Sequence, residues 1–160
     1  HKGVKSEFIA PTAKGLDINN ECKKCSRRQK MKIMVCFDGS NSSKEAIRLA
    51  TEHARTFGAS IAIVTSMVKG TESEREEIEK VELDLEYEKN IVVNEGVPCE
   101  THLLIRGLSA GEDLLRFAEE KKIDEIIIGI KRRSKVEKIV FGSTAQYIIL
   151  KALCPVVTVK

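Results

Sequence analysis

The chain has 160 residues, of which 42% are apolar and 32% charged, a balance typical of one globular domain and unlike that of a disordered segment. No apolar run approaches the roughly 20 residues that span a membrane, and the polar N-terminus lacks the apolar block of a signal peptide. The net charge of +3 is uneven, because residues 1–30 carry eight Lys and Arg against three Asp and Glu. The other 130 residues therefore sum to −2 and lack the basic face that nucleic-acid binding requires.

Residues 1–30 show no sustained apolar period, so we expect a flexible extension or a remnant of expression, with the folded domain over residues 31–160. The spacing Cys22-x-x-Cys25 supplies two ligands where a structural zinc site needs four, unless two chains pool their pairs. The cysteine count of five is odd, and three of the five lie in or beside apolar segments. This usage favours a reduced, cytoplasmic protein.

The first half of the domain alternates strand, helix and strand. "KIMVCFDGS" (residues 32–40) predicts a buried strand closed by a turn, and Ser40 or Ser42 is suited to cap a following helix. Gly58 is suited to end that helix, and "SIAIVTSMV" (60–68) predicts the second strand. The helix has one apolar face at helical spacing, made of Ala46, Ile47, Ala50, Ala54 and Phe57.

The second half repeats this alternation. An acidic helix is predicted over residues 71–94, followed by a strand in "CETHLLIRG" (99–107) and a helix opened by Ser109. "DEIIIGI" (124–130) predicts the fourth strand. A loop rich in Lys and Arg then leads to a helix over residues 143–153 and a fifth strand in "VVTVK" (156–160).

Strands that alternate with helices predict an α/β fold, a doubly wound, Rossmann-like sheet of five parallel strands with helices on both faces. Ligands of such folds bind beyond the carboxyl ends of the strands, where the winding direction reverses. With the strand order 3-2-1-4-5, this point lies between the first strand, which ends near Asp38, and the fourth, which ends at Gly129. Two separate motifs therefore indicate one crevice.

The crevice residues suit a phosphorylated ligand. Gly129 has no side chain to block a flat ligand, and Gly142, Ser143 and Thr144 open the last helix, whose first amides and dipole attract anions. Purely structural alternatives remain open: Gly129 could only end a strand, residues 142–144 could only cap a helix, and Asp38 could only form a turn.

Residues 32–160 resemble the universal stress protein family, which implies an adenine-nucleotide alpha hydrolase-like fold. The likeness lies in "IMVCFDGS", in "RGLSAGEDLLRFAEEKKIDEIIIG" and in the segment from Gly129 to the final strand. The ATP-binding branch of that family carries Gly, two residues, Gly, nine residues, then Gly-Ser or Gly-Thr. Gly129 and Gly142-Ser143 match this spacing, and Arg132 replaces the middle glycine.

The resemblance implies that the chain binds ATP or another adenine nucleotide, and Mg²⁺ is suited to bridge its phosphates and Asp38. Residues carried over by their position are Cys36 and Ser66 near the adenine, Asp38 near the ribose or the metal-linked phosphates, Ile128 and Gly129 on the nucleoside, and Gly142, Ser143 and Thr144 on the phosphates. Arg132 has two possible roles: its guanidinium grips phosphate, or it closes the site.

We therefore expect a stress-response protein in which a bound nucleotide shifts conformation or partner affinity. The alternatives are a dimeric interaction module that binds no nucleotide, and a slow ATPase. Catalysis has little support, because no Walker-type loop is present and His53 and His102 are predicted away from the crevice. The apolar final strand, expected at a sheet edge, and the resemblance together favour a homodimer.

Overall fold

The computed structural model describes residues 30–67, 75–130 and 141–160, which form five strands and four helices in strict alternation. The predicted extension up to residue 29, including Cys22 and Cys25, lies outside the described residues, as do Arg132 and the first residues of the predicted 71–94 helix. The strands are β1 (Lys32–Cys36), β2 (Ser60–Ser66), β3 (Cys99–Leu104), β4 (Glu125–Gly129) and β5 (Val156–Val159). The helices are α2 (Asn41–Phe57), α3 (Arg75–Asn94), α4 (Ala110–Lys121) and α5 (Ser143–Lys151).

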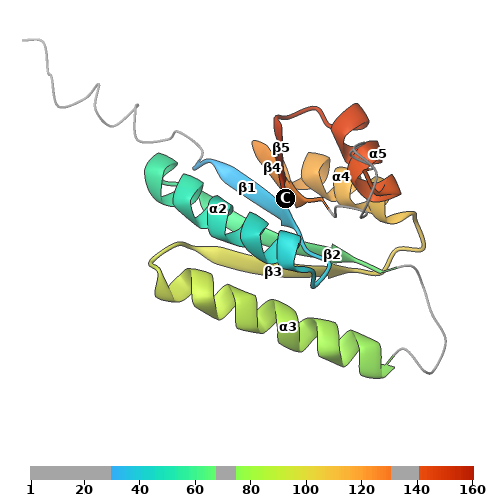
Figure 1. Cartoon of the computed structure of the whole chain (residues 1–160), viewed down its shortest axis with the longest axis horizontal. Helices are drawn as coiled ribbons and strands as arrows, with labels where there is room; N and C mark the ends of the chain where they lie inside the picture. Colours follow the sequence, from blue (N-terminus) through green and yellow to red (C-terminus); the bar gives the residue numbers. More distant parts are fainter. Residues whose placement is uncertain (1–29, 68–74, 131–140) are drawn as a thin grey trace, which may run out of the picture.

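The strands form one parallel sheet in the order β3-β2-β1-β4-β5 (Figure 1), which confirms the predicted topology. At the centre of the sheet Cys36 of β1 pairs with Val64 of β2 on one side and with Ile128 of β4 on the other. The winding direction reverses between β1 and β4, so the crevice predicted from the topology lies at the ends of these two strands.

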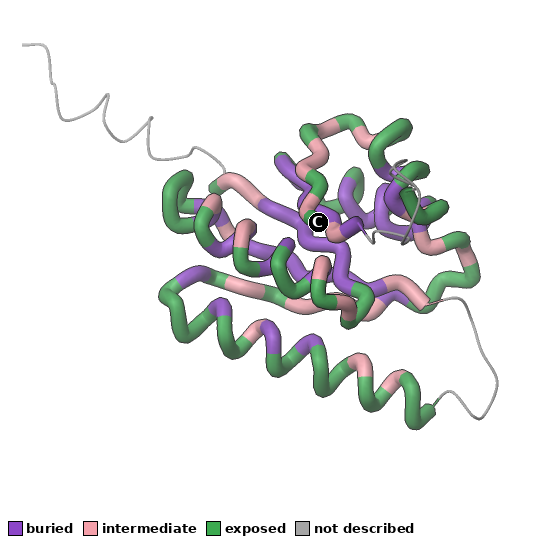
Figure 2. Tube along the Cα trace, in the orientation of Figure 1, coloured by how far each residue is buried: buried purple, intermediate pink, exposed green. Residues whose placement is uncertain are grey.

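Alternate side chains of each strand enter two separate cores, because successive residues of a strand point to opposite faces. Ile33, Val35 and Ile127 pack with α2 and α3, whereas Met34, Cys36 and Ile126 pack with α4 and α5. Figure 2 shows the central strands buried and the outer faces of the helices exposed. This two-sided burial explains the nearly continuous apolar runs of the sequence.

Most helix ends lie where the sequence predicts them. The Ser40 hydroxyl accepts a hydrogen bond from the Ser43 amide at 3.3 Å and caps α2, and Gly58 ends that helix with a φ of 64°. Ser109 opens α4, where its amide donates to Glu112 Oε2 at 3.2 Å. The α5 helix ends at Lys151, before the predicted residue 153, because the chain becomes extended at residue 152 and turns into β5.

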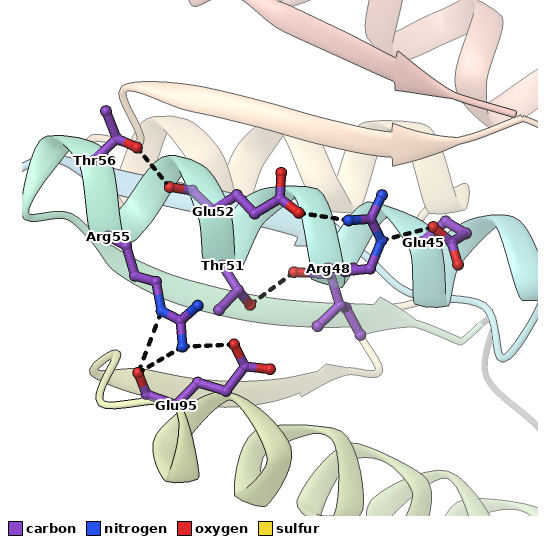
Figure 3. A network of polar contacts seen from close by, with 8 residues as sticks. Glu45, Arg48, Thr51, Glu52, Arg55, Thr56 and Glu95 are labelled. Carbon is purple, nitrogen blue, oxygen red and sulfur yellow. Dashed lines mark hydrogen bonds and ion pairs between the residues drawn. The ribbon is translucent and has the colours of Figure 1, made fainter.

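The exposed side of α2 carries a row of polar contacts, and one of them joins α2 to the end of α3 (Figure 3). Arg55 Nη2 lies 2.9 Å from Glu95 Oε2, and its guanidinium also donates to the Glu95 carbonyl. Exposed pairs of this kind contribute little to stability, so the helices are held mainly by their buried faces. Within the described part of the chain, none of the helices has the length and apolar character needed to cross a membrane.

Candidate functional site

Three strands bring predicted site residues together at the carboxyl ends of the strands. Asp38 follows β1, Ser66 is the last residue of β2, and Gly129 is the last residue of β4. Parallel pairing of β1 with both neighbours places these three ends side by side. The helix after β1, α2, packs on one face of the sheet, and α5 packs on the other. In doubly wound folds a ligand site is expected where the winding reverses between two such strands.

Asp38 forms the turn that starts α2. Its Oδ1 accepts hydrogen bonds from the Ser40 amide at 3.0 Å and from the Ser40 hydroxyl. Gly39 between them has a φ of 74°, a conformation that glycine adopts without strain. Asp38 therefore does form a turn, which was the structural alternative to a role in ligand binding. Its side chain is nevertheless exposed at the edge of the crevice, where it can also meet a ligand.

The two glycines of the motif have different reasons to be glycine. A Cβ built on Gly129 would lie 2.5 Å from the Ser42 carbonyl carbon and 2.6 Å from the Ser43 amide nitrogen. Close packing against the first turn of α2 therefore requires this glycine. Gly142 has a φ of −63°, which any residue adopts, and a Cβ there would meet no described atom within 4 Å. The packing of the described residues therefore does not explain Gly142.

Ser143 and Thr144 form the first turn of α5, next to the start of α4. Both serve as walls of a small cavity of about 160 Å³ that also involves Ser109, Gly111 and Tyr147. The first amides of α5 have no acceptor within the helix, and the helix dipole adds a partial positive charge there. The start of α5 therefore provides donors for an anionic group.

A larger cavity, of about 430 Å³, lies beside Asp38 and Ser66. One side of it is made of the segments that follow β1 and β2, and the other side is α3. The contribution of α3 to this cavity was not predicted from the sequence, although the spacing of its lining residues places them on one helix face. The residues lining the cavity are Phe37, Asp38, Gly39, Thr65, Ser66, Met67, Glu77, Lys80, Val81 and Asp84.

Cys36 and Ile128, two of the predicted contacts, have their side chains in the core shared with α4 and α5. They are only 7% and 5% exposed. Burial is the main cause that raises the pKa of the Cys36 thiol to about 12, and the nearby Asp38 and Cys154 add to it. Cys36 is therefore a neutral, packed side chain beneath the crevice and no nucleophile at neutral pH.

Asp113 of α4 is a buried carboxylate that the sequence analysis did not single out. Its Oδ2 accepts a hydrogen bond from the Ser66 hydroxyl at 3.0 Å, and Arg106 Nε lies 3.5 Å from its Oδ1. The sequence could have indicated this burial, because Asp113 lies four residues before Phe117 and therefore on the apolar face of the helix. A charged residue on a buried helix face is rare without a partner.

The two described histidines lie away from the crevice, as predicted. His53 of α2 pairs with Glu125 at the start of β4, with 3.1 Å between Nδ1 and Oε2, at the opposite edge of the sheet. His102 of β3 packs against the ring of Phe117, with 4.7 Å between the ring centroids. Neither has a position from which it could act on a ligand in the crevice.

A doubly wound parallel sheet with a polar opening at its strand ends defines a class of α/β proteins that bind ligands at the point where the winding reverses. The model of the universal stress protein family matches residues 30–160. The chain therefore belongs to the universal stress protein family.

Individual relatives agree with this assignment. A universal stress protein of Methanocaldococcus jannaschii is 32% identical over 149 residues, and the match covers 81% of each chain. Among solved structures, a universal stress protein of Archaeoglobus fulgidus is 34% identical with a TM-score of 0.72, over 81% of this chain and 93% of that one. An A. fulgidus structure in complex with dAMP is 34% identical with a TM-score of 0.70, over 81% and 98% of the two chains.

Proposed function

We propose that this protein binds an adenine nucleotide in the crevice at the carboxyl ends of β1 and β4. The observation that carries the proposal is the dAMP complex of the A. fulgidus universal stress protein, which this chain matches over 81% of its own length and 98% of that chain. Two observations support it: a Cβ on Gly142 would meet no described atom within 4 Å, which is consistent with room for a phosphate group, and the start of α5 offers donors.

In this proposal the crevice has a phosphate end and a nucleoside end. The amides and hydroxyls of Gly142, Ser143 and Thr144 hold the phosphates. Asp38 and Ser66 meet the nucleoside, while Gly129 lies close to it and the side chains of Cys36 and Ile128 form the packed floor. Arg132 lies outside the described residues, and both of its predicted roles, gripping phosphate or closing the site, remain predictions.

We further propose that the natural ligand is ATP, with Mg²⁺ held mainly by phosphate oxygens. Within the described residues no group of three His, Cys, Asp or Glu side chains is placed to hold a metal ion. In the proposal Asp38 adds one carboxylate oxygen to an ion that the nucleotide brings with it, and Mg²⁺ commonly binds in this way.

The bound nucleotide acts as a regulator in this proposal. A ligand shifts a conformational equilibrium only if it binds one state more tightly than the other. In this proposal the nucleotide lies between the start of α2, which packs on one face of the sheet, and the start of α5, which packs on the other, so it contacts both layers of the protein. We propose binding, and not turnover, as the main activity.

The edge strand β5 is proposed as the surface through which two copies pair. Ile126 and Ile130 of the β4 side donate to the carbonyls of Pro155 and Val159, so every second residue of β5 faces β4. The amides of Val156 and Thr158 therefore face outward, where a second β5 strand can accept them.

Thermal unfolding with and without nucleotide tests the binding proposal. ATP at 100 times its dissociation constant should stabilise the fold by about 2.7 kcal/mol, and mass spectrometry under native conditions should detect a retained adenine nucleotide. The absence of any shift with millimolar ATP, ADP and AMP would contradict the proposal and favour the alternative of a module that binds no nucleotide.

A further inference from the structure

The helix α3 has an apolar stripe on the side that faces away from the sheet. Leu83, Tyr87 and Ile91 follow one another at intervals of four residues, which places them on one side of the helix. They are 72%, 65% and 39% exposed, whereas the buried Leu85 and Val92 lie on the opposite side. The solvent side of such a helix is ordinarily polar. A contiguous apolar stripe there indicates a surface that another segment covers.

The charge around the apolar stripe is acidic. The helix Arg75–Asn94 carries seven Asp and Glu against three Lys and Arg, a net charge of −4. Glu79, Asp84 and Glu86 lie three or four residues from Leu83 or Tyr87 and therefore flank the stripe. A second copy of α3 would bring the same negative charge to the contact, which disfavours pairing of two copies here. The stripe instead suits a segment that combines apolar and basic side chains.

The N-terminal extension, residues 1–29, has this composition. It lies outside the described residues, and it carries seven Lys and Arg against three Asp and Glu. Its net charge of +4 is equal and opposite to that of α3. Its larger apolar side chains are Val4, Phe8, Ile9, Leu16 and Ile18, and its basic residues are Lys2, Lys5, Lys14, Lys23, Lys24, Arg27 and Arg28. The extension and the apolar stripe are therefore complementary in both properties.

The extension joins the domain at the amino ends of the strands, where α3 also ends (Figure 1). The Met31 carbonyl accepts a hydrogen bond from the Ser60 amide at 2.9 Å, and the neighbouring Ile61 amide donates to the Pro98 carbonyl at 2.9 Å. Pro98 follows the last residue of α3, Asn94, by four positions. A helix of 20 residues is about 30 Å long, and an extended chain covers about 3.3 Å per residue. Residues 1–29 are therefore long enough to follow α3 along its whole length.

We propose that residues 1–29 dock on the apolar stripe of α3, with their basic side chains beside its acidic flanks. The contact is intramolecular, so the extension is present at a high effective concentration and needs little intrinsic affinity. This inference goes beyond the proposed nucleotide binding and does not depend on it.

Deuterium exchange of the full chain, measured by mass spectrometry, tests the proposal. The amides of residues 1–29 should exchange at least about tenfold more slowly in the wild type than in Leu83→Ser, which removes apolar contact from the stripe. Leu150→Ser is the matched control, because Leu150 is 71% exposed on α5, on the opposite layer of the protein. This control should keep the slow exchange of the wild type.

A second variant tests the charges and leaves the folded domain unaltered. The combination Lys23→Glu, Lys24→Glu, Arg27→Glu and Arg28→Glu gives the extension a net charge of −4, the same sign as α3. Exchange in residues 1–29 should then be as fast as in Leu83→Ser, and 1 M NaCl should speed it in the wild type by screening.

Three results would overturn the proposal. One is exchange in residues 1–29 of the wild type that is as fast as in the charge-reversed variant. Another is equal acceleration by Leu83→Ser and Leu150→Ser, which would place the contact elsewhere. The third is a solution mass, measured by light scattering, that halves in Leu83→Ser, which would assign the stripe to a second copy.

Discussion

The backbone of Ser42 occupies the space where a side chain on Gly129 would lie. A Cβ on Gly129 would lie 2.5 Å from the Ser42 carbonyl carbon, and backbone atoms cannot move aside as the end of a flexible side chain can. Gly129→Ala should therefore destabilise the fold by about 1–3 kcal/mol. Urea unfolding measures this, and Gly142→Ala is the control, because its Cβ meets nothing and stability should stay within about 0.5 kcal/mol. Equal losses of stability in both variants would contradict the packing role of Gly129.

Gly142→Val should remove the nucleotide response without unfolding the protein. The φ of −63° at this position is open to valine, and the space around it is free of described atoms, so the unliganded fold should be retained. The bulky side chain would instead fill the space proposed for phosphate. Thermal unfolding with saturating ATP should then show no stabilisation, against about 2.7 kcal/mol at 100 times the dissociation constant for the wild type. A retained shift would place the phosphate elsewhere.

Arg106 should matter more to stability than Arg116, although both pair with Glu120. Arg106 also provides the positive charge beside the buried Asp113, and its removal leaves that carboxylate without compensation. Arg106→Ala should therefore cost about 1–3 kcal/mol, whereas Arg116→Ala, which loses only an exposed pair, should leave the urea midpoint nearly unchanged. Similar midpoints for the two variants would show that Asp113 needs no counter-charge.

Stability should fall in alkaline solution because of Cys36. Its pKa is raised from 9.0 to about 12, mainly by burial, so above pH 9 the unfolded chain loses this proton while the folded chain keeps it. The stabilising contribution is complete below pH 9 and is lost as the pH rises toward 12. Between pH 10 and 11 the slope should be steeper in the wild type than in Cys36→Ala by about 1.4 kcal/mol per pH unit. Urea unfolding at several pH values measures both slopes, and parallel slopes would argue that the thiol ionises in the folded state.

Thr158→Pro should convert a dimer to a monomer if β5 pairs with a second copy. Proline lacks an amide hydrogen, and position 158 is one whose amide faces away from β4, so the bonds within the sheet are retained. Light scattering on a size-exclusion column should give the mass of two chains for the wild type and of one chain for the variant. Thr101→Pro, in the opposite edge strand β3, should keep the wild-type mass wherever the variant folds. A monomeric wild type would contradict the proposed pairing.

The fold was predictable because each element carries its own local signal. Apolar runs of strand length alternate with helical periods, and Ser40, Gly58 and Ser109 mark helix ends by their own chemistry. The predicted topology alone indicated that Asp38, which follows β1, lies near the carboxyl end of β4. The reason for glycine at position 129 was not predictable, since it depends on which backbone segment approaches from another element.

The part of the site that was missed depends on contacts between distant segments. Ser66 and Asp113 are 47 residues apart, and a period of apolar residues does not reveal that a buried carboxylate has found a hydroxyl partner. The acidic helix α3 was predicted as a helix, but only its packing on the sheet reveals that Glu77 and Asp84 line the cavity.

The limited burial of α3 affects how a ligand reaches the cavity. Of its twenty residues only Leu85, Glu88 and Val92 are buried, and all three lie in its second half. The first half, which carries Glu77 and Lys80 on the cavity wall, has no fully buried residue, and its Val81 packs on the core while it stays partly exposed. Local opening requires the least free energy where few apolar contacts must separate. We therefore expect the amides of this first half to exchange with deuterium faster than those of β1, so that local opening of this wall admits a ligand while the sheet stays intact.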